Sequence, residues 1–193
     1  LLRFLDDGPP PIYVGFGSMG DLAPAGVMEP VLEALKQTGQ RGVLLAGREG
    51  SPRPKQQGNV LFVDEVPHAW LFPRMAAVIH HGGAGTTGAG LRAGVPNIVA
   101  PLAGDQYTWA GRVTALGVGL RNESLTKLTV NGLAAAIHTA VTDAGLRARA
   151  AALGEKIRAE DGVAAAVALI ERHAAAGRER GMQPAGGAGR SVG

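Results

Sequence analysis

The sequence predicts an α/β protein with a doubly wound parallel sheet. Short stretches rich in Val, Ile and Leu alternate along the chain with stretches whose apolar residues recur at helical spacing. Hydrophobic residues make up 46% of the chain but aromatic residues only 4%, and 30 residues are glycine. Such a composition favours an aliphatic sheet buried on both faces and joined by tight turns. Alternating strands and helices imply right-handed crossovers between parallel neighbours.

In the first half of the chain, three apolar stretches have strand character: residues 12–18, 42–47 and 59–63. A helix is expected over 24–38, where apolar residues share one face and Gly39 follows as a stop signal. The polar stretch 48–58 is expected to be a loop. Three prolines in a row cannot join a central ladder, so residues 1–11 are expected to be the end of a connection.

In the second half, strands are expected over three further stretches: residues 76–79, 97–101 and 117–120. A helix should begin near Gly85 and end at Gly94, and another should cover 108–116. The chain to about residue 173 is expected to be helical, and 174–193 lacks a core pattern and is expected to be a flexible tail. Residues 12–173 are therefore predicted to form one domain.

Composition argues against several classes of protein. The net charge is +3, and the whole excess lies in residues 147–193, with no basic stripe interleaved with aromatic residues, so no nucleic-acid partner is expected. Cysteine is absent, which excludes disulfides, thiol nucleophiles and cysteine-ligated metals. No apolar run reaches about 18 residues and no leader peptide is apparent, so we expect a cytoplasmic protein without stable membrane insertion.

Unusual residues follow three of the expected strands. Gly17 and Ser18 come after the first strand, residues 81–87 after the fourth, and Asp105 and Gln106 after the fifth. Ligands of open α/β sheets bind beyond the carboxyl ends of the strands, where these residues would lie together. We therefore expect one ligand site built from these three turns.

The turn HGGAGTT, residues 81–87, has the character of a phosphate site. Gly83 and Gly85 allow a ligand to approach the backbone, and a helix that begins there points its free N–H groups toward an anion. Thr86 and Thr87 add hydroxyl donors. The same letters also fit a glycine-rich turn with a threonine cap and no ligand at all.

His80 and His81 are consecutive, so their side chains point to opposite faces and cannot readily ligate one metal ion. No metal site is expected. One imidazole should be buried, and the other should face the ligand and donate to a phosphate oxygen. Asp105 and Gln106 offer acceptors and donors for the vicinal hydroxyls of a sugar ring, although a surface loop has the same composition.

An NAD(P)-binding module is the rival interpretation. Residues 15–20 and 83–88 both fit the G-x-G-x-x-G pattern, and Arg48, after the second strand, could meet a 2′-phosphate. Against it, the helix after the first copy begins only beyond Asp21, and no acidic residue ends the second strand.

Three segments, GFGSM at 15–19 and the longer stretches 63–96 and 101–119, together resemble the carboxyl-terminal half of bacterial UDP-glycosyltransferases. Sterol glucosyltransferases and the enzymes that glycosylate antibiotics and macrolides are similar in kind. The resemblance extends over about residues 8–173. It implies a single lobe of the two-lobed GT-B fold, Rossmann-like, which binds the nucleotide-sugar while an amino-terminal lobe binds the acceptor.

The resemblance also implies roles for the residues of the three turns. His81 and the backbone of Gly85 and Thr86 would hold the diphosphate, with Ser18 and Thr87 assisting. Asp105 and Gln106 would bind the sugar. The remaining donor-binding positions are Gly17 and Gly83, in the same turns, and Val66, in the segment whose backbone contacts uracil or thymine.

The implied reaction is inverting transfer of a glucose-type hexose from a UDP- or TDP-sugar to a hydroxyl of a lipophilic or natural-product acceptor. No cofactor and no metal are implied. The family's catalytic base is a histidine of the amino-terminal lobe, so no catalytic residue is expected in this chain, which should bind donor with little turnover alone. The acceptor lobe could be part of a longer chain or a separate subunit, or the domain could be degenerate and serve only interaction.

Overall fold

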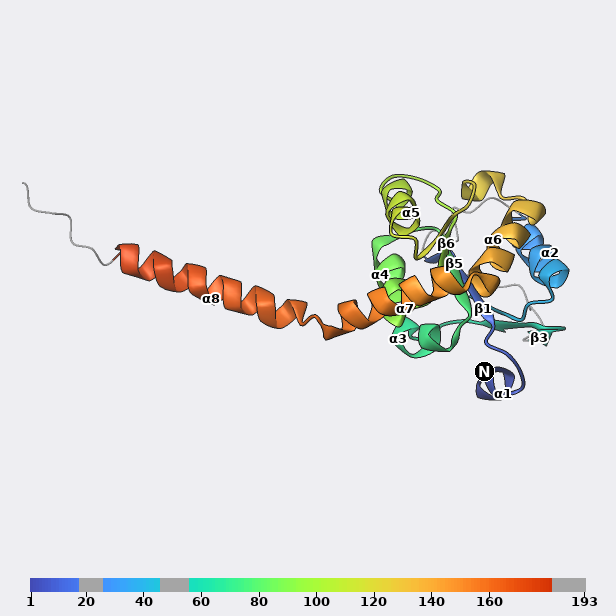
Figure 1. The fold of residues 1–193 in the computed structure, drawn as a ribbon, viewed down its shortest axis with the longest axis horizontal. Helices are drawn as coiled ribbons and strands as arrows, with labels where there is room; N and C mark the ends of the chain where they lie inside the picture. Colours follow the sequence, from blue (N-terminus) through green and yellow to red (C-terminus); the bar gives the residue numbers. More distant parts are fainter. Residues whose placement is uncertain (18–25, 46–55, 182–193) are drawn as a thin grey trace, which may run out of the picture. The chain divides into compact units, whose positions relative to one another are not determined.

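The structure is a computed structural model that describes residues 1–17, 26–45 and 56–181 of the 193-residue chain (Figure 1). Ser18 and Arg48, both singled out in the sequence, lie outside the described residues. The chain divides into two compact units, Leu1–Ile157 and Arg158–Gly193. The first unit holds the sheet and every described residue of the predicted site.

The sheet has seven strands in the order β3-β4-β2-β1-β5-β6-β7. The strands are β1 (Ile12–Gly15), β2 (Gly42–Leu45), β3 (Gln56–Gln57), β4 (Val60–Val63), β5 (Ala77–His80), β6 (Asn97–Val99) and β7 (Gly119–Arg121). All neighbours are parallel except β3, which pairs antiparallel with β4. Counted along the chain, the parallel strands follow the order 3-2-1-4-5-6 of a doubly wound dinucleotide-binding sheet, which confirms the predicted fold class.

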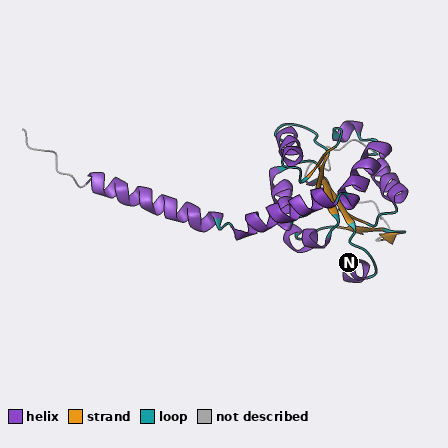
Figure 2. Cartoon of the chain, in the orientation of Figure 1, coloured by secondary structure: helices purple, strands orange, loops and turns teal. Residues whose placement is uncertain are grey.

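Helices lie on both sides of this sheet (Figure 2). They are α1 (Leu2–Asp6), α2 (Met28–Thr38), α3 (His68–Leu71), α4 (Ala84–Ala93), α5 (Gln106–Ala115), α6 (Val130–Thr142), α7 (Ala144–Ala159) and α8 (Gly162–Gly181), with short 3-10 helices η2 (Phe72–Arg74) and η3 (Leu125–Lys127). Helices α2 and α4 end at Gly39 and Gly94, whose φ angles are +66° and +76°. Both stop signals in the sequence are thereby confirmed, because glycine adopts this left-handed conformation without strain.

The core follows from the alternation of side chains along β1, which is buried on both faces. Ile12 and Val14 pack in one cluster with residues of α2 and α6, whereas Tyr13 packs in another with Leu71 and Phe72. The fully buried central strands therefore have the continuous apolar character that the sequence indicated.

Several elements differ from the sequence expectations. The first strand ends at Gly15 rather than at residue 18, and β3 pairs two residues of the stretch expected to be a loop. Within residues 1–11, α1 buries Phe4 against the core, and the Arg41 guanidinium lies 4.2 Å from the centre of the Phe4 ring. Short helices such as α1 and α3 offer too few residues for a periodic pattern to show.

The second unit, described by itself, contains helix α8. Large apolar side chains on it are exposed: Val163, Val167, Leu169 and Ile170. The helix extends to Gly181, past residue 174, where the flexible tail was expected to begin. Residues 182–193 lie outside the described residues. Over the parts of the chain that the structure describes, no helix is long and apolar enough to cross a membrane.

Candidate functional site

The site lies at the point where the winding of the sheet reverses, between β1 and β5. The chain leaves β1 toward β2 on one side and leaves β5 toward β6 on the other. The two turns therefore lie next to each other at the carboxyl edge, the place where sheets wound in this way form a ligand-binding crevice. Gly17, in the turn after β1, has a φ of +60°, and a Cβ atom placed on it would lie 3.0 Å from Cε1 of His81. The two turns therefore meet at the His81 ring.

The His81 imidazole is held between two glycines. A Cβ atom on Gly83 would lie 2.5 Å from Nε2 of His81, so the ring fits only because both Gly17 and Gly83 lack side chains. The residue is 7% exposed, and burial lowers the pKa of its imidazole, while the nearby Asp105 carboxylate acts in the opposite direction. Its Nδ1 atom is buried and has no hydrogen-bond partner among the described residues. Buried polar atoms are nearly always paired, so Nδ1 of His81 calls for a partner beyond the described residues.

Helix α4 begins beside this ring without a side-chain cap. Gly83 is the N-cap residue, and the first intrahelical bond runs from the Thr87 N–H to the Gly83 carbonyl at 2.9 Å. The preceding N–H groups of the first turn have no acceptor within the helix, and the helix dipole adds partial positive charge at this end. A Cβ atom on Gly85 would meet nothing within 4 Å, so the backbone is open to a ligand there.

The two threonines of this turn have different surroundings. Thr87 is fully buried, and its hydroxyl donates to the Gly83 carbonyl at 2.9 Å, which stabilises the first turn of α4. Thr86 is only partly buried at the same end of the helix. A direct contact of Thr86 or Thr87 with a ligand stays a prediction, and Thr86 is the better placed of the two to make one.

The turn after β6 packs against the turn after β5. A Cβ atom on Gly82, whose φ is +93°, would lie 2.8 Å from Val99 Cγ1 and 3.0 Å from the Gln106 carbonyl oxygen. Gln106 is 7% exposed, and its Oε1 accepts the N–H groups of Leu102 at 2.7 Å and Ala103 at 3.1 Å. Its side-chain carbonyl thus shapes the turn, which leaves the amide nitrogen for the predicted contact with a sugar.

Asp105 lies exposed at the start of α5. Its Oδ2 accepts a hydrogen bond of 3.1 Å from the indole Nε1 of Trp109, one helical turn further on. Sequence analysis missed this role of Trp109, although the spacing of four residues on a helix was available as a signal. The Trp109 indole fixes the carboxylate at the edge where the turns after β5 and β6 meet.

Val66 is placed apart from the other predicted residues. It lies between β4 and α3 and packs against the cluster that contains Tyr13 and Phe72. Strand β4 is three positions from β5 in the sheet, so the carboxyl ends of the two strands are about 14 Å apart. The structure therefore brings together the turns of Gly17, His81 and Gln106 and leaves Val66 at a distance along the same edge.

The neighbouring histidine is fully buried. His80 is 0% exposed, and its Nε2 lies 3.0 Å from Oδ1 of Asn97. Burial is the main cause that lowers the pKa of His80 to about 4. The hydrogen bond to Asn97 acts in the opposite direction, and the charges of His81 and His68 lower the pKa as well. Both histidines have little exposed surface, but among the described residues only His80 has a hydrogen-bond partner for its buried ring nitrogen, whereas Nδ1 of His81 has none.

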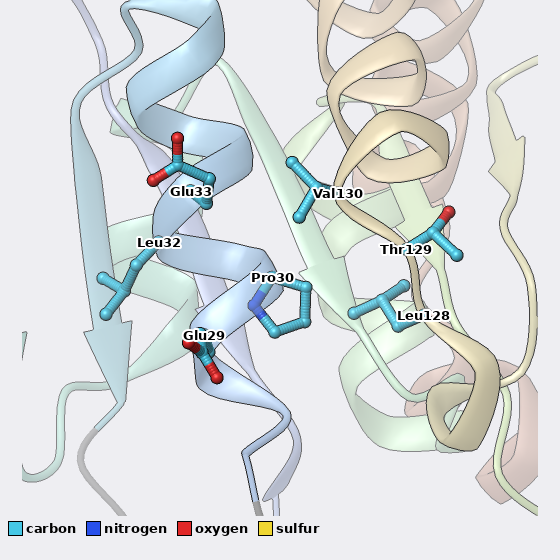
Figure 3. A pocket seen from close by; sticks show the side chains of 7 residues that line it. All are labelled: Glu29, Pro30, Leu32, Glu33, Leu128, Thr129 and Val130. Atoms are coloured by element: carbon cyan, nitrogen blue, oxygen red, sulfur yellow. The ribbon is translucent and has the colours of Figure 1, made fainter.

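A separate hollow of about 710 Å³ lies between α2 and the start of α6 (Figure 3). Its lining residues are Glu29, Pro30, Leu32, Glu33, Leu128, Thr129 and Val130. None of the residues predicted from the sequence lines it. Among the described ranges, no group of three or more His, Asp or Glu side chains could hold a metal ion.

Comparison with known proteins finds a matching family. Residues 43–170 match the family described as erythromycin biosynthesis protein CIII-like, C-terminal domain. A sterol 3-beta-glucosyltransferase of Arabidopsis thaliana is 40% identical over 174 residues, which cover 89% of this chain and 28% of the relative. The vancomycin aglycone glucosyltransferase of Amycolatopsis orientalis is 44% identical over 170 residues, or 88% of this chain and 40% of the relative. The chain thus spans less than half the length of these curated relatives.

Solved structures agree with these relatives. The glycosyltransferase of kitacinnamycin superposes with a TM-score of 0.75 at 29% identity, covering 86% of this chain and 44% of the other. UDP-glucose: anthocyanidin 3-O-glucosyltransferase, solved in complex with UDP, gives a TM-score of 0.72 at 23% identity, covering 83% and 39%. At that identity the second likeness concerns the fold alone.

Proposed function

Since the chain belongs to the family of erythromycin biosynthesis protein CIII-like C-terminal domains of GT-B glycosyltransferases, we propose that it is the donor-binding half of an inverting hexosyltransferase. One observation carries the proposal. The His81 ring, with a buried Nδ1 that lacks a described partner, lies beside the uncapped start of α4. An unpaired polar group beside an uncapped helix start is consistent with a ligand site, and donors at a helix N-terminus favour an anion such as a diphosphate.

In the proposed reaction, a hydroxyl oxygen of the acceptor attacks the anomeric carbon of the sugar. The bond from that carbon to the diphosphate oxygen breaks, its electron pair stays with the diphosphate, and the hydroxyl proton passes to a base outside this chain. The N–H groups of α4 and the His81 imidazole stabilise the charge that develops on the diphosphate. Removal of one such donor from comparable sites costs about 3 kcal/mol of barrier, on the order of a hundredfold in rate.

The other predicted residues extend the donor site in two directions. The Asp105 carboxylate, fixed by Trp109, accepts from sugar hydroxyls, while the Gln106 amide nitrogen donates to them. In the opposite direction, the segment at Val66 contacts the uracil or thymine base, about 14 Å along the sheet edge from the end of β5. An extended nucleoside diphosphate-sugar, with UDP or TDP and a glucose-type hexose, spans these positions.

The acceptor is proposed to be a lipophilic molecule or natural product held by an amino-terminal lobe or by a separate subunit, which also supplies the base. The names of two relatives, a sterol glucosyltransferase and a vancomycin aglycone glucosyltransferase, support this class of acceptor.

Calorimetric titration of the 193-residue chain with UDP-glucose, TDP-glucose, UDP and NADP tests the proposal. We expect a UDP or TDP compound to bind and His81→Ala to weaken that binding by at least about tenfold. His138→Ala is the matched control, because His138 is an exposed histidine on α6, away from the three turns, and should change nothing.

The remaining outcomes contradict the proposal in different ways. Binding of NADP alone would favour a dinucleotide module, and no binding at all would favour a degenerate interaction domain. Appreciable glucosyl transfer by the chain alone would show that the base does not lie outside it.

A further inference from the structure

The buried histidine at the end of β5 has a hydrogen-bond partner for each ring nitrogen. The Gly82 N–H donates to Nδ1 of His80 at 3.0 Å, so Nδ1 carries no proton and the neutral ring has its proton on Nε2. That Nε2–H donates to Oδ1 of Asn97 at 3.0 Å, and the Asn97 amide donates in turn to the Val95 carbonyl at 2.9 Å. The donor and the acceptor of each of these three hydrogen bonds are therefore fixed.

These hydrogen bonds determine the backbone direction of the turn after β5. Gly82 is the residue between His81 and Gly83, and its left-handed φ of +93° turns the backbone sharply there. The bond to His80 directs the Gly82 N–H into the protein, while the Cα atom of Gly82 faces the Val99 side chain. Since Gly82 directly follows His81, the bond to His80 also sets the direction from which the His81 ring enters the crevice.

The same pair locates the helix that follows. Asn97, in β6, lies against Gly90 of α4 so closely that a Cβ atom on Gly90 would overlap the Asn97 amide oxygen. The pair therefore joins β5, β6 and α4, the three elements that carry the turns around His81 and Gln106.

We propose that His80 and Asn97 are a positioning pair for the diphosphate of the donor, which orients Gly82 and so holds the His81 ring over the start of α4. Neither residue touches the ligand. The proposal rests on the proposed function of the same site, because it concerns how that site is kept in a binding geometry. Burial keeps His80 neutral, consistent with a pKa lowered to about 4, so Nδ1 remains an acceptor at physiological pH.

Asn97→Asp tests the pair by exchanging the amide nitrogen, which donates to the Val95 carbonyl, for an oxygen that cannot donate, so some loss of stability is expected as well. The carboxylate still accepts from His80 Nε2, but its charge favours a second proton, which binds at Nδ1, the atom that accepts the Gly82 N–H. We expect the affinity of this variant for UDP-glucose to fall about tenfold between about pH 8 and about pH 6. The unchanged protein should vary by less than about threefold, since the diphosphate of UDP-glucose keeps its charge over this range.

Other charged groups near the pair also affect how binding depends on pH. The charges of His81 and His68 lower the pKa of His80, and the charge of Asp105 raises the pKa of His81 against the effect of burial. Protonation of His81 at low pH would strengthen the attraction for a diphosphate, which is opposite to the effect expected of Asn97→Asp. Asn122→Asp is the control, because it places the same substitution at a buried asparagine after β7, two strands from β5, where the amide nitrogen has no partner among the described residues.

Two substitutions of His80 separate positioning from mere stability. His80→Asn keeps an oxygen that can accept the N–H two residues further on, as asparagine does in Asx turns, whereas His80→Leu removes the acceptor. Both should lower the thermal stability. We expect His80→Asn to retain UDP-glucose affinity within about fivefold and His80→Leu to lose at least about tenfold more.

Equal affinities for the two His80 variants, or the same pH dependence for Asn97→Asp and Asn122→Asp in folded protein, would restrict the pair to a structural role and overturn the proposal. If the unchanged protein binds neither UDP-glucose nor TDP-glucose, the proposed function itself fails, and the pair has no donor to position.

Discussion

Two consecutive histidines at the end of β5 point to opposite sides of the backbone, and they differ in the hydrogen bonding of their ring nitrogens. On the inner side, His80 is 0% exposed and both of its ring nitrogens have partners. On the crevice side, His81 is 7% exposed, yet its buried Nδ1 has no partner among the described residues. Both side chains have little exposed surface, so low exposure alone does not distinguish a structural histidine from one proposed to bind a ligand. The completeness of the hydrogen bonding does, because buried polar groups in a stable fold are nearly always paired.

The largest expected effect comes from a substitution that breaks the inner side. In Gly90→Ala, the new Cβ would overlap the Asn97 amide oxygen and push it away from His80. Overpacking costs about 2 kcal/mol and a buried hydrogen bond left unmade about 2 more, so we expect the free energy of unfolding to drop by about 4 kcal/mol. Urea unfolding followed by tryptophan fluorescence measures this change, since Trp70 and Trp109 both lie in the first unit.

Gly88→Ala is the control for that substitution. Gly88 lies in the same helix, and a Cβ atom there would meet nothing within 4 Å. Replacing it should raise the free energy of unfolding by about 0.5 to 1 kcal/mol, because alanine is the better helix former. If Gly90→Ala were as stable as Gly88→Ala, the packing of α4 on the pair would have to be much looser than the structure indicates.

The second effect is a dependence of stability on pH. Because burial lowers the pKa of His80 from 6.5 to about 4, the unfolded chain takes up a proton below about pH 6.5, whereas the folded protein does so only near pH 4. The unfolded state binds more protons in this window, so stability falls as the pH falls, by about 3 kcal/mol for this residue. Urea unfolding of the protein between about pH 7 and pH 4 measures the loss.

The same titration of His80→Asn isolates the contribution of His80. Burial also lowers the pKa values of His81 and His68, so these residues add to the loss in both proteins. The curve of the variant should be flatter than that of the unchanged protein. Parallel curves would mean that His80 takes up a proton as readily in the folded protein as in the unfolded chain, contrary to its burial and to the hydrogen bond that it accepts from Gly82.

Sequence patterns were sufficient for the sheet and for the arrangement of the turns that form the candidate site. The stretches around β1, β5 and β6 were identified because central strands are continuous apolar runs, and the helix stops at Gly39 and Gly94 because a left-handed residue favours glycine. The turns after these strands were expected at one edge because the carboxyl ends of parallel strands meet there. Opposite orientations of His80 and His81 followed from strand geometry alone.

The hydrogen bonds that side chains make between strands and within turns could not be predicted in the same way. Asn97 appears in the sequence only as a polar residue at the start of an apolar stretch, and its bond to His80 depends on β5 and β6 being paired in register. Likewise, Gln106 bends its side chain back to two backbone N–H groups, which no spacing indicates. These contacts depend on side-chain conformations fixed by tertiary packing, and a one-residue change in register would remove them.

A smaller effect is expected from a substitution on the crevice side, next to His81. In Gly83→Ala, the new Cβ would lie 2.5 Å from Nε2 of His81, so the ring has to rotate away from the start of α4. The backbone of Gly83, with φ −60° and ψ 140°, is accessible to alanine, so the free energy of unfolding should change by less than about 1 kcal/mol. Donor affinity should nevertheless fall about tenfold, or about 1.4 kcal/mol, because the imidazole no longer faces the diphosphate.

Calorimetric titration with UDP-glucose and TDP-glucose, together with urea unfolding, measures both consequences of Gly83→Ala. The inner and crevice sides then give opposite patterns: Gly90→Ala loses stability first, whereas Gly83→Ala loses affinity at nearly constant stability. Unchanged affinity in Gly83→Ala would mean that the His81 ring does not contact the donor, since a displaced ring cannot keep a hydrogen bond whose strength depends on its geometry.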